Sequence, residues 1–354
     1  MDLRDLGWNS FFEAQFAEVG SGSLRAARVV EELKQFYRIH DGEREYLAEP
    51  AGRVRYHAEE RCDLPAVGDW VAITARPAED RARIESVLPR RTKLSRKVAG
   101  RGMAEQIIAT NLDVVFIVSA LNQEFSLRRI ERYLTLVWDS GAHPAVLLNK
   151  ADLCAQAERF VCEVEDIALG APVHLLSATE ARGVDEVRGH LSAGKTAAFV
   201  GSSGVGKSTI INQLIGHEEL RVQRVRDGDD RGKHTTTTRQ MFFLPEGGIV
   251  IDTPGMRELQ LWDSEEGLEQ AFGDIDQLAE LCRFRDCSHN GEPGCAVEAA
   301  VAKGSLKSDR LESHRKLKAE LRFLERKADP AVAKEHKERW KKIHKAMRNF
   351  SKGN

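Results

Sequence analysis

Two short motifs stand in an order that restricts how this chain can fold. The sequence NKAD at residues 149–152 lies before the glycine-rich sequence GSSGVGKST at residues 201–209. Each motif follows an apolar run of the kind that forms a buried strand. Loops that leave the carboxyl edge of a parallel sheet meet at one crevice, so the two motifs predict a common ligand site. Their order along the chain then determines how the strands are connected.

The glycine-rich sequence predicts a phosphate loop. It matches the pattern G-x-x-x-x-G-K-[ST] and lies between an apolar run and a segment with helical spacing. Backbone N–H groups of such a loop and the dipole of the following helix favour phosphate, whereas a turn that binds nothing is the alternative. Lys207 would bind and act on the β- and γ-phosphates, and Ser208 would ligate Mg²⁺. The predicted phosphate-binding residues are Gly201, Ser202, Ser203, Gly204, Val205, Gly206, Lys207, Ser208 and Thr209.

The NKAD sequence predicts recognition of guanine. An ionised aspartate only accepts hydrogen bonds, and guanine offers its N1–H and exocyclic amine as neighbouring donors, a pattern that adenine lacks. Lys150 would pack its aliphatic stem against the nucleotide. A second loop, after the next apolar run, would contact the O6 position through its backbone. The predicted base-binding residues are Asn149, Lys150, Ala151, Asp152, Ser177 and Ala178.

Residues 250–255, VIDTPG, supply further predicted contacts to Mg²⁺ and the γ-phosphate. Asp252 would hold Mg²⁺ through water, and Gly255 would donate its N–H to the γ-phosphate. One threonine of residues 235–238 would close over the metal, although this run is also typical of an exposed polar loop.

Two residues near these loops bear on the rate of hydrolysis. Many GTPases place a glutamine directly after the switch glycine to orient the attacking water, and this chain has Met256 there. Because a thioether cannot orient water in this way, we expect slow intrinsic hydrolysis. His234 is a candidate catalytic proton donor, and an exposed loop histidine without a role is the alternative.

Along the chain the two predicted base-binding loops come first, followed by the phosphate loop and then the metal-binding loop. Ordinary GTPases begin with the phosphate loop. A doubly wound sheet tolerates such a circular permutation because the ligand contacts come from loops at one edge. We therefore predict an α/β fold with a circularly permuted P-loop GTPase domain over residues 101–265. The switch after Asp252 would lead directly into the C-terminal domain and pull on it.

Residues 1–100 predict an OB-like β-barrel that binds RNA. Short runs of alternating apolar and polar residues are separated by turn residues, as in small barrels. An OB-fold binds RNA through one face and its loops, and a purely structural barrel is the alternative. The basic run at residues 90–100 is predicted to be a linker. The predicted strands include residues 27–33, 43–49, 52–58 and 67–73.

Residues 266–354 are predicted to form a helical zinc-binding domain. Its cysteines and histidine follow the spacing C-x4-C-x-H-x5-C, and a Pro-Gly turn would let them converge. Three thiolates and an imidazole make a closed tetrahedral set, which suits one structural Zn²⁺. The predicted ligands are Cys282, Cys287, His289 and Cys295. The other cysteines, Cys62, Cys154 and Cys162, are expected to be buried or partly buried thiols.

The C-terminal end is basic. Residues 303–354 contain 17 Lys and Arg against 7 Asp and Glu, although the whole chain has a net charge of −2. Such a tail can bind RNA phosphates, or it can be the solvated face of helices. Ser308 and Asp329 are predicted N-caps of two final helices, with Pro330 opening the second.

The start of the chain and its hydropathy predict the location. The first residues lack a basic and apolar leader, and no apolar run approaches the roughly 20 residues that span a bilayer. We therefore expect a cytoplasmic protein without membrane contact.

The motifs NKADL, GSSGVGKST, HTTT, DTPG and CRFRDCSHNGEPGC, in this order behind a barrel, resemble the ribosome small subunit-dependent GTPase A (RsgA) family over nearly the full length. The resemblance implies a GTPase that binds the small ribosomal subunit and its rRNA during late maturation. It also implies that the subunit stimulates hydrolysis of GTP to GDP, which drives release. We expect a monomer whose cofactors are one Zn²⁺ and Mg²⁺ with GTP.

Two other functions stay open at this point. The first is an RNA-binding assembly factor that uses GTP only as a conformational ligand, which a turnover rate unaffected by ribosomal subunits would favour. The second is a metabolic NTPase without RNA. The guanine motif argues against ATP, and the basic tail argues against a small-molecule substrate.

Overall fold

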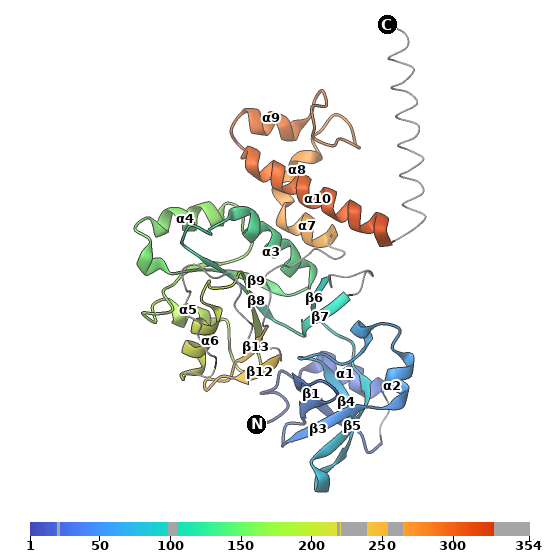
Figure 1. The fold of residues 1–354 in the computed structure, drawn as a ribbon. Helices are drawn as coiled ribbons and strands as arrows, with labels where there is room; N and C mark the ends of the chain where they lie inside the picture. Colours follow the sequence, from blue (N-terminus) through green and yellow to red (C-terminus); the bar gives the residue numbers. More distant parts are fainter. Residues whose placement is uncertain (20–21, 98–104, 218–219, 221–238, 254–264, 329–354) are drawn as a thin grey trace.

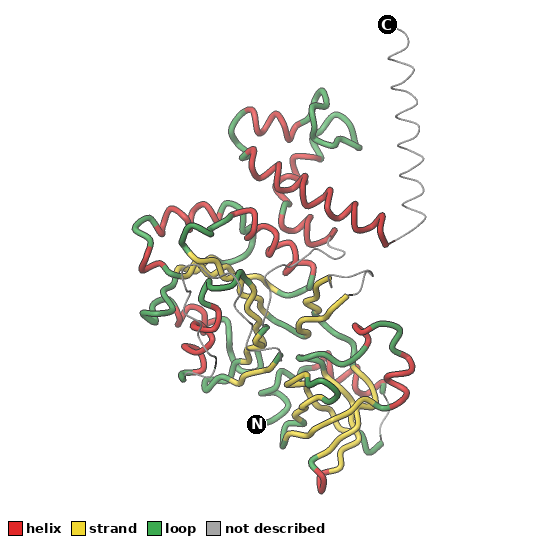
Figure 2. Tube along the Cα trace, viewed as in Figure 1, coloured by secondary structure: helices red, strands yellow, loops and turns green. Residues whose placement is uncertain are grey.

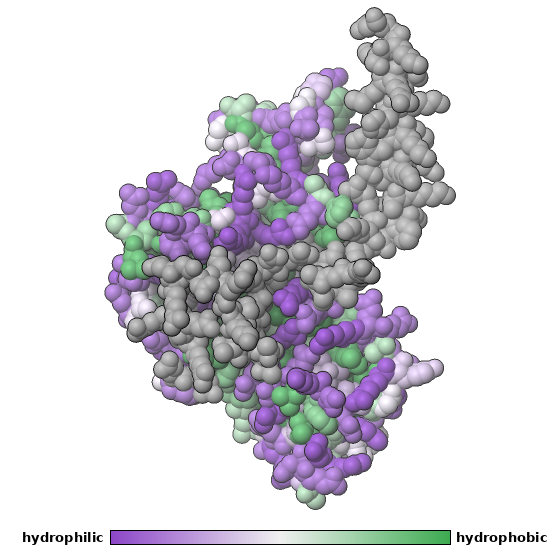
Figure 3. Space-filling view, viewed as in Figure 1, coloured by the Kyte–Doolittle hydropathy of each residue, from purple (hydrophilic) through white to green (hydrophobic). Residues whose placement is uncertain are grey.

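The computed structural model describes residues 1–19, 22–97, 105–217, 220, 239–253 and 265–328 (Figure 1). A barrel forms the lower part of the view, an α/β sheet the middle, and helices the upper part. Hydrophilic residues cover most of the described surface in Figure 3, with hydrophobic ones scattered between them. Among the described helices, none is both long and apolar enough to cross a bilayer.

The N-terminal part is a closed five-stranded barrel, in the lower part of Figure 2, where all strands are yellow. Neighbouring strands follow the order β1-β2-β3-β5-β4, and β4 returns to pair with β1. Val29, Ile39 and Ile84 are fully buried in the barrel core, and buried residues alternate with more exposed ones along β3, as the two-residue period of a strand requires. The strands are β1 (Arg25–Glu32), β2 (Tyr37–His40), β3 (Glu45–Pro50), β4 (Trp70–Arg76) and β5 (Arg81–Val87).

The sequence-based prediction of a strand over residues 52–58 is wrong. This segment is the helix α2 (Gly52–His57), and none of its residues is buried. The alternation of Val54 and Tyr56 with arginines mimics a strand, but the barrel already closes through other pairs. Short 3-10 turns η1 (Arg61–Asp63) and η2 (Pro77–Glu79) also connect barrel strands.

The helix α1 (Ser10–Glu18) precedes the barrel and packs against it. The side chain of Asn9 caps its first turn by accepting a hydrogen bond from Phe11 N at 3.0 Å. Phe12 and Leu6 are buried against Trp70 of β4. The N-terminal helix therefore covers the apolar surface of the barrel.

The run predicted as a linker, residues 90–100, is instead partly a strand. β6 (Lys93–Lys97) pairs antiparallel with β7 (Glu105–Thr110). Leu94 and Ile108 bury their side chains in the same core as the central sheet. The arginines and lysines of this run suggested a solvated linker, but the core contact of Leu94 fixes the hairpin in place.

The central part is an α/β sheet whose strand order is β10-β9-β8-β11-β13-β12. The strands are parallel to one another except β12, which is antiparallel to β13. The sheet joins the barrel because β12 pairs with β1 at Gln240 and Glu31. The strands are β8 (Val114–Ala120), β9 (His143–Asn149), β10 (Val173–Leu175), β11 (Thr196–Val200), β12 (Gln240–Phe243) and β13 (Ile249–Asp252).

Helices cover both faces of this sheet. α3 (Leu127–Asp139) and α4 (Ala157–Glu165) pack on one face, where Val115, Ile117 and Val146 are buried. α5 (Val184–Gly189) and α6 (Lys207–Ile215) pack on the other face. Because strand residues alternate between two apolar layers, the strands are continuous apolar runs, as the sequence analysis expected.

The C-terminal part is helical, and its helices are α7 (Glu265–Ala271), α8 (Gly273–Ala279), α9 (Ala296–Ala302) and α10 (Ser308–Ala328). The carbonyl of Lys307 accepts the first helical bonds of α10, from Arg310 N at 3.1 Å and Leu311 N at 3.3 Å. Ser308 is therefore the first residue of the helix, and its prediction as the N-cap is off by one residue. Asp329 and Pro330 lie outside the described residues.

Candidate active site and metal centre

The predicted phosphate loop connects β11 to α6 at the carboxyl edge of the sheet. Its glycines adopt positive φ angles, 144° at Gly201, 79° at Gly204 and 102° at Gly206. A Cβ on Gly206 would lie 2.1 Å from Nδ2 of Asn149, and one on Gly201 would lie 2.3 Å from the carbonyl oxygen of Val118. Glycine is thus required at these two positions both by conformation and by lack of space.

Asn149 ties together the three predicted nucleotide loops. Its Nδ2 donates to the carbonyl oxygen of Val205 at 2.7 Å, and its Oδ1 accepts from Ala178 N at 3.0 Å. The side chain is buried with 2% exposure. The structure therefore brings the loop of residues 149–152, the loop at Ser177 and Ala178, and the phosphate loop to one place.

The loop after β9 makes a sharp turn at Lys150, whose φ is 65°. The turn continues as the 3-10 element η3 (Ala151–Leu153), and Ala151 N donates to the carbonyl oxygen of Leu176 at 3.1 Å. Asp152 is exposed, so its carboxylate is accessible to a ligand. Ser177 is buried, and its hydroxyl lies 3.1 Å from that of Thr179.

Lys207 points back into its own loop. Its Nζ donates to the carbonyl oxygens of Gly201 and Ser202, each at 2.7 Å. Burial lowers the pKa of Lys207 to about 8, and the charge of Asp252 opposes this shift. Burial also raises the pKa of Asp252, while Lys207 opposes that. The charges of Lys207 and Asp252, both partly buried, thus act on each other where a phosphate and a cation would bind.

Sequence reasoning missed two residues of this site, Arg129 and Tyr133 of α3. Nη1 of Arg129 donates to Ser202 Oγ at 2.8 Å. Burial raises the pKa of the Tyr133 hydroxyl, and a hydrogen bond with Ser202 opposes this shift. The spacing of four residues places both on one face of α3. This spacing could have indicated that the two side chains act together. It did not indicate a contact with the phosphate loop, because α3 is distant from that loop in sequence.

Several predicted residues lie outside the described part of the chain. They are His234, residues 235–238, Gly255 and Met256. Ser203 and Gly204 are exposed on the loop, and Ser208 and Thr209 are partly buried in the first turn of α6.

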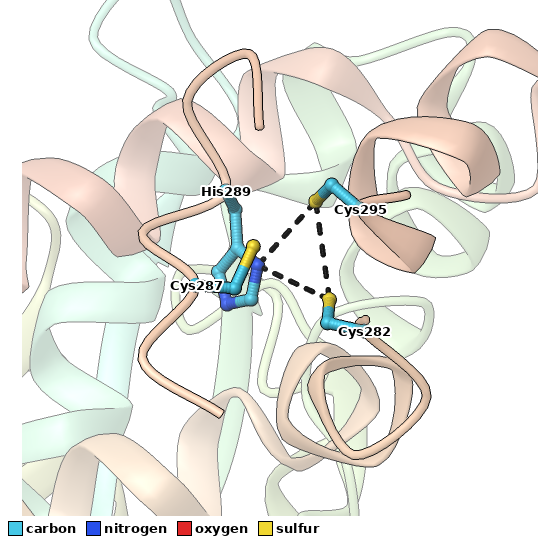
Figure 4. Close-up of side chains that lie close together, drawn as sticks. All are labelled: Cys282, Cys287, His289 and Cys295. Atoms are coloured by element: carbon cyan, nitrogen blue, oxygen red, sulfur yellow. Dashed lines mark hydrogen bonds between the residues drawn. The ribbon is translucent and has the colours of Figure 1, made fainter. Parts of the chain in front are cut away.

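The four predicted metal ligands converge between α8 and α9 (Figure 4). Their ligand atoms all lie within 4.8 Å of one another. Nδ1 of His289 lies 3.6 Å from the sulfurs of Cys282 and of Cys295, which are 3.9 Å apart. His289, with φ of 59°, is buried on a tight turn, so the imidazole is held toward the cysteines.

Backbone N–H groups support the sulfurs of this centre. Ala296 N donates to Cys282 Sγ at 3.3 Å, and Glu298 N donates to Cys295 Sγ at 3.4 Å. Both groups belong to the N-terminal turn of α9, which favours negative charge. Such donors stabilise thiolates, and a closed set of three thiolates and one imidazole fits a structural metal ion.

The remaining cysteines follow the expectation only in part. Cys62 and Cys154 are partly buried, whereas Cys162 on α4 is exposed. The prediction that Cys162 is at least partly buried is therefore wrong, since the apolar stripe of α4 is formed by other residues such as Val164.

Comparison with known proteins shows similarity over almost the whole chain. The family model described as RsgA GTPase matches residues 87–262. A protein from Opitutus terrae named "Small ribosomal subunit biogenesis GTPase RsgA" is 42% identical over 98% of this chain and 97% of its own. A protein of that name from Methanosarcina acetivorans is 46% identical over 81% of this chain and 78% of its own.

Solved structures show the same fold. The structure of YjeQ from Thermotoga maritima has a TM-score of 0.64 at 30% identity, covering 84% of this chain and 98% of that one. YloQ, whose structure is described as a circularly permuted GTPase, has a TM-score of 0.62 at 23% identity, covering 85% of this chain and 96% of that one. The predicted fold, a barrel before a permuted GTPase with a C-terminal helical part, is confirmed.

A second family model, described as ABC transporter, matches residues 184–353. This range contains the phosphate loop but not the loop of residues 149–152. Because many NTPases share a phosphate loop, we attribute this match to that loop. The relatives that cover the whole chain determine the family.

Proposed function

This chain belongs to the RsgA GTPase family and is a GTP hydrolase, and we propose that it acts in assembly of the small ribosomal subunit. The assignment of the nucleotide site rests on Asn149, which hydrogen-bonds to both the phosphate loop and the second base loop. Guanine would be read by Asp152 and the backbone at Ser177 and Ala178. One ligand can therefore reach all three loops.

In the proposed mechanism, Lys207 exchanges partners when nucleotide binds. Its Nζ leaves the carbonyl oxygens of Gly201 and Ser202 and donates to phosphate oxygens of GTP. The charged phosphates raise the pKa of this buried amine and hold it protonated. Ser208 and Asp252 would hold Mg²⁺, which neutralises developing charge on the phosphates. Backbone N–H groups of the loop, up to Thr209, position the phosphates.

We propose that intrinsic hydrolysis is slow because Met256 follows Gly255 in place of a glutamine. His234 and one threonine of residues 235–238 would complete the site as proton donor and metal ligand. Contact with the small subunit would bring these groups to the γ-phosphate, so that hydrolysis follows docking and drives release.

We propose Zn²⁺ as the metal bound by Cys282, Cys287, His289 and Cys295. The donor set supports this assignment, because thiolates and imidazole select Zn²⁺ over Mg²⁺ or Ca²⁺. A closed set leaves no position for substrate, so the ion would stabilise the C-terminal helices.

We propose residues 1–100 and residues 266–354 as the two RNA-binding domains on either side of the GTPase domain, residues 101–265. The names of the relatives support the small ribosomal subunit as the partner. Basic side chains, such as those of residues 303–354, would bind rRNA phosphates with a strong salt dependence. The protein would act as a cytoplasmic monomer.

The test is GTP hydrolysis by the purified protein alone, with small subunits and with large subunits. We expect a large stimulation by small subunits only. Equal slow rates in all three would contradict the proposal and leave a GTP-binding protein with another partner. RNA-independent turnover at a high rate would favour a metabolic NTPase.

A further inference from the structure

α3 contacts the phosphate loop on one side and the C-terminal helices on another. Arg129 and Tyr133 face Ser202, as described above. Arg128 and Arg132 each precede one of them by one residue, which turns them about 100° around the helix axis, and Glu131 lies two residues from both. They face α10, so α3 links two parts of the molecule within two helical turns.

Several ion pairs join α3 to α10. Nη2 of Arg128 lies 2.8 Å from Glu312 Oε2, and Nη2 of Arg132 lies 2.5 Å from Glu320 Oε1. Glu131 lies 3.0 Å from Arg310, and this pair is almost fully buried. Removal of one partner of a buried pair leaves an uncompensated charge, so this contact fixes α10 on α3.

Arg310 extends the connection to the helices that follow the switch region in sequence. It binds both carboxylate oxygens of Asp274 in α8, at 2.7 and 2.6 Å, and the carbonyl oxygen of Ala271 at 2.9 Å. α7 also lies directly against α3, because a Cβ on Gly267 would be 2.2 Å from the carbonyl oxygen of Thr135. The contact at Gly267 leaves no space for a side chain between α7 and α3, so a shift of α7 toward α3 must also move α3.

We propose that Arg129 is a positioning residue whose placement against Ser202 is set by the docking of α10 on α3. The C-terminal helices and the nucleotide therefore affect each other through α3, independently of the switch segments. Arg129 is exposed and hydrogen-bonded to the phosphate loop, so its side chain can move when α3 moves. Arg310 holds α3 in place through Glu131. By linkage, whatever displaces α10 changes nucleotide affinity, and nucleotide changes the stability of α10 docking.

This inference rests on the proposed nucleotide site, and the experiment separates the two. The variants are Arg129→Gln, the distal double variant Glu312→Gln/Glu320→Gln, and their combination. Arg159→Gln, from an exposed pair with Glu163 on α4, is the matched control. The affinities of each for fluorescent GDP and for a non-hydrolysable GTP analogue are measured without ribosomal subunits, together with zinc content and thermal unfolding.

We expect the ratio of the two affinities to change about 2- to 30-fold in Arg129→Gln and in the distal variant. The combination should change it no more than Arg129→Gln alone, because both act through one connection. GDP should alter hydrogen exchange of α10 in the wild type but not in Arg129→Gln, which a merely structural arginine would not produce. Arg159→Gln should match the wild type.

A wild-type affinity ratio in the distal variant, or additive effects in the combination, would overturn the proposal. If Arg129→Gln fails to fold, Ser202→Ala removes the same contact from the loop side. Lys207→Ala tests the site separately. Undiminished nucleotide binding by that variant would refute the nucleotide site itself, whereas weakened binding with a wild-type ratio in the distal variant refutes only the connection.

Discussion

The metal centre and the nucleotide site differ in what their polar groups contact without a ligand. In the metal centre, three sulfurs and an imidazole converge on one point. In the nucleotide site, Lys207 has substitute partners in the carbonyl oxygens of its own loop. A charged group with an internal partner can release its ligand at low cost, whereas convergent thiolates without a cation repel one another. One site is therefore built for a permanent occupant and the other for exchange.

Loss of the metal should have the largest effect. Structural Zn²⁺ contributes an apparent binding free energy of about 10–16 kcal/mol, comparable with the whole stability of a domain. We expect Cys295→Ser to lose the bound metal and to melt the C-terminal helices well below the wild type. Metal analysis and circular dichroism check this. Exposed Cys162→Ser is the control, and full metal content with unchanged melting in Cys295→Ser would contradict the assignment.

Loss of the Lys207 amine should slow turnover strongly without unfolding the protein. We expect Lys207→Ala to lower kcat by about 10²–10³-fold, because a preorganised positive charge is lost. Its melting temperature should stay near the wild type, since the buried amine contributes two hydrogen bonds but costs desolvation. Phosphate release and calorimetry measure these. Lys195→Ala, at the opposite edge of the sheet beside Asp113, should keep full activity.

Gly206→Ala should break the tie between the loops. The new Cβ would collide with the Asn149 amide, and φ at this position is positive. We expect a loss of about 1–3 kcal/mol in the free energy of unfolding, with weaker GDP binding. Urea unfolding and GDP titration measure the effect. Gly189→Ala has free space at a helical position and should be neutral or stabilising. Equal stability of the two variants would refute the crowding argument.

The pH dependence should be the smallest effect. The folded pKa of Lys207, about 8, is below the ordinary value of 10.5, so the unfolded chain binds more protons between these values. This group therefore destabilises the fold below pH 8, and the penalty is relieved as the pH rises to 10.5. GDP holds the amine charged, so GDP affinity should fall by up to about tenfold per pH unit above 8. A Lys207→Arg variant stays charged, and any nucleotide binding it retains should lack this slope.

The part of the fold that could be predicted from sequence is the part with a strict period or motif. Two apolar layers made β8, β9 and β11 continuous apolar runs, and the spacing of Cys282 to Cys295 indicated a metal centre. The segment of α2 could not be assigned correctly, because alternation predicts a strand only where a partner strand is available. Leu94 likewise needed knowledge of the core before β6 could be distinguished from a linker.

The candidate site shows the same division. The loop residues were identified because each type has a chemical reason to occur at its position. The role of Asn149 in linking the loops by hydrogen bonds was not identified, because its partners Val205 and Ala178 are distant in sequence. Arg129 was missed for that reason too. Contacts between helix faces depend on tertiary packing, which one sequence does not specify.

The order of strands in the central sheet has a consequence for how the chain folds during synthesis. β8, β9 and β10 follow one another in the chain and pair with one another, so this half of the sheet can form before the phosphate loop is translated. β11 then adds to the free edge of β8. The hairpin of β12 and β13 comes last and must fill the gap between β11 and the barrel strand β1. Until that hairpin inserts, the central sheet is not continuous with the barrel and Asp252, at the end of β13, is not in place, so the predicted Mg²⁺–GTP site cannot be completed earlier.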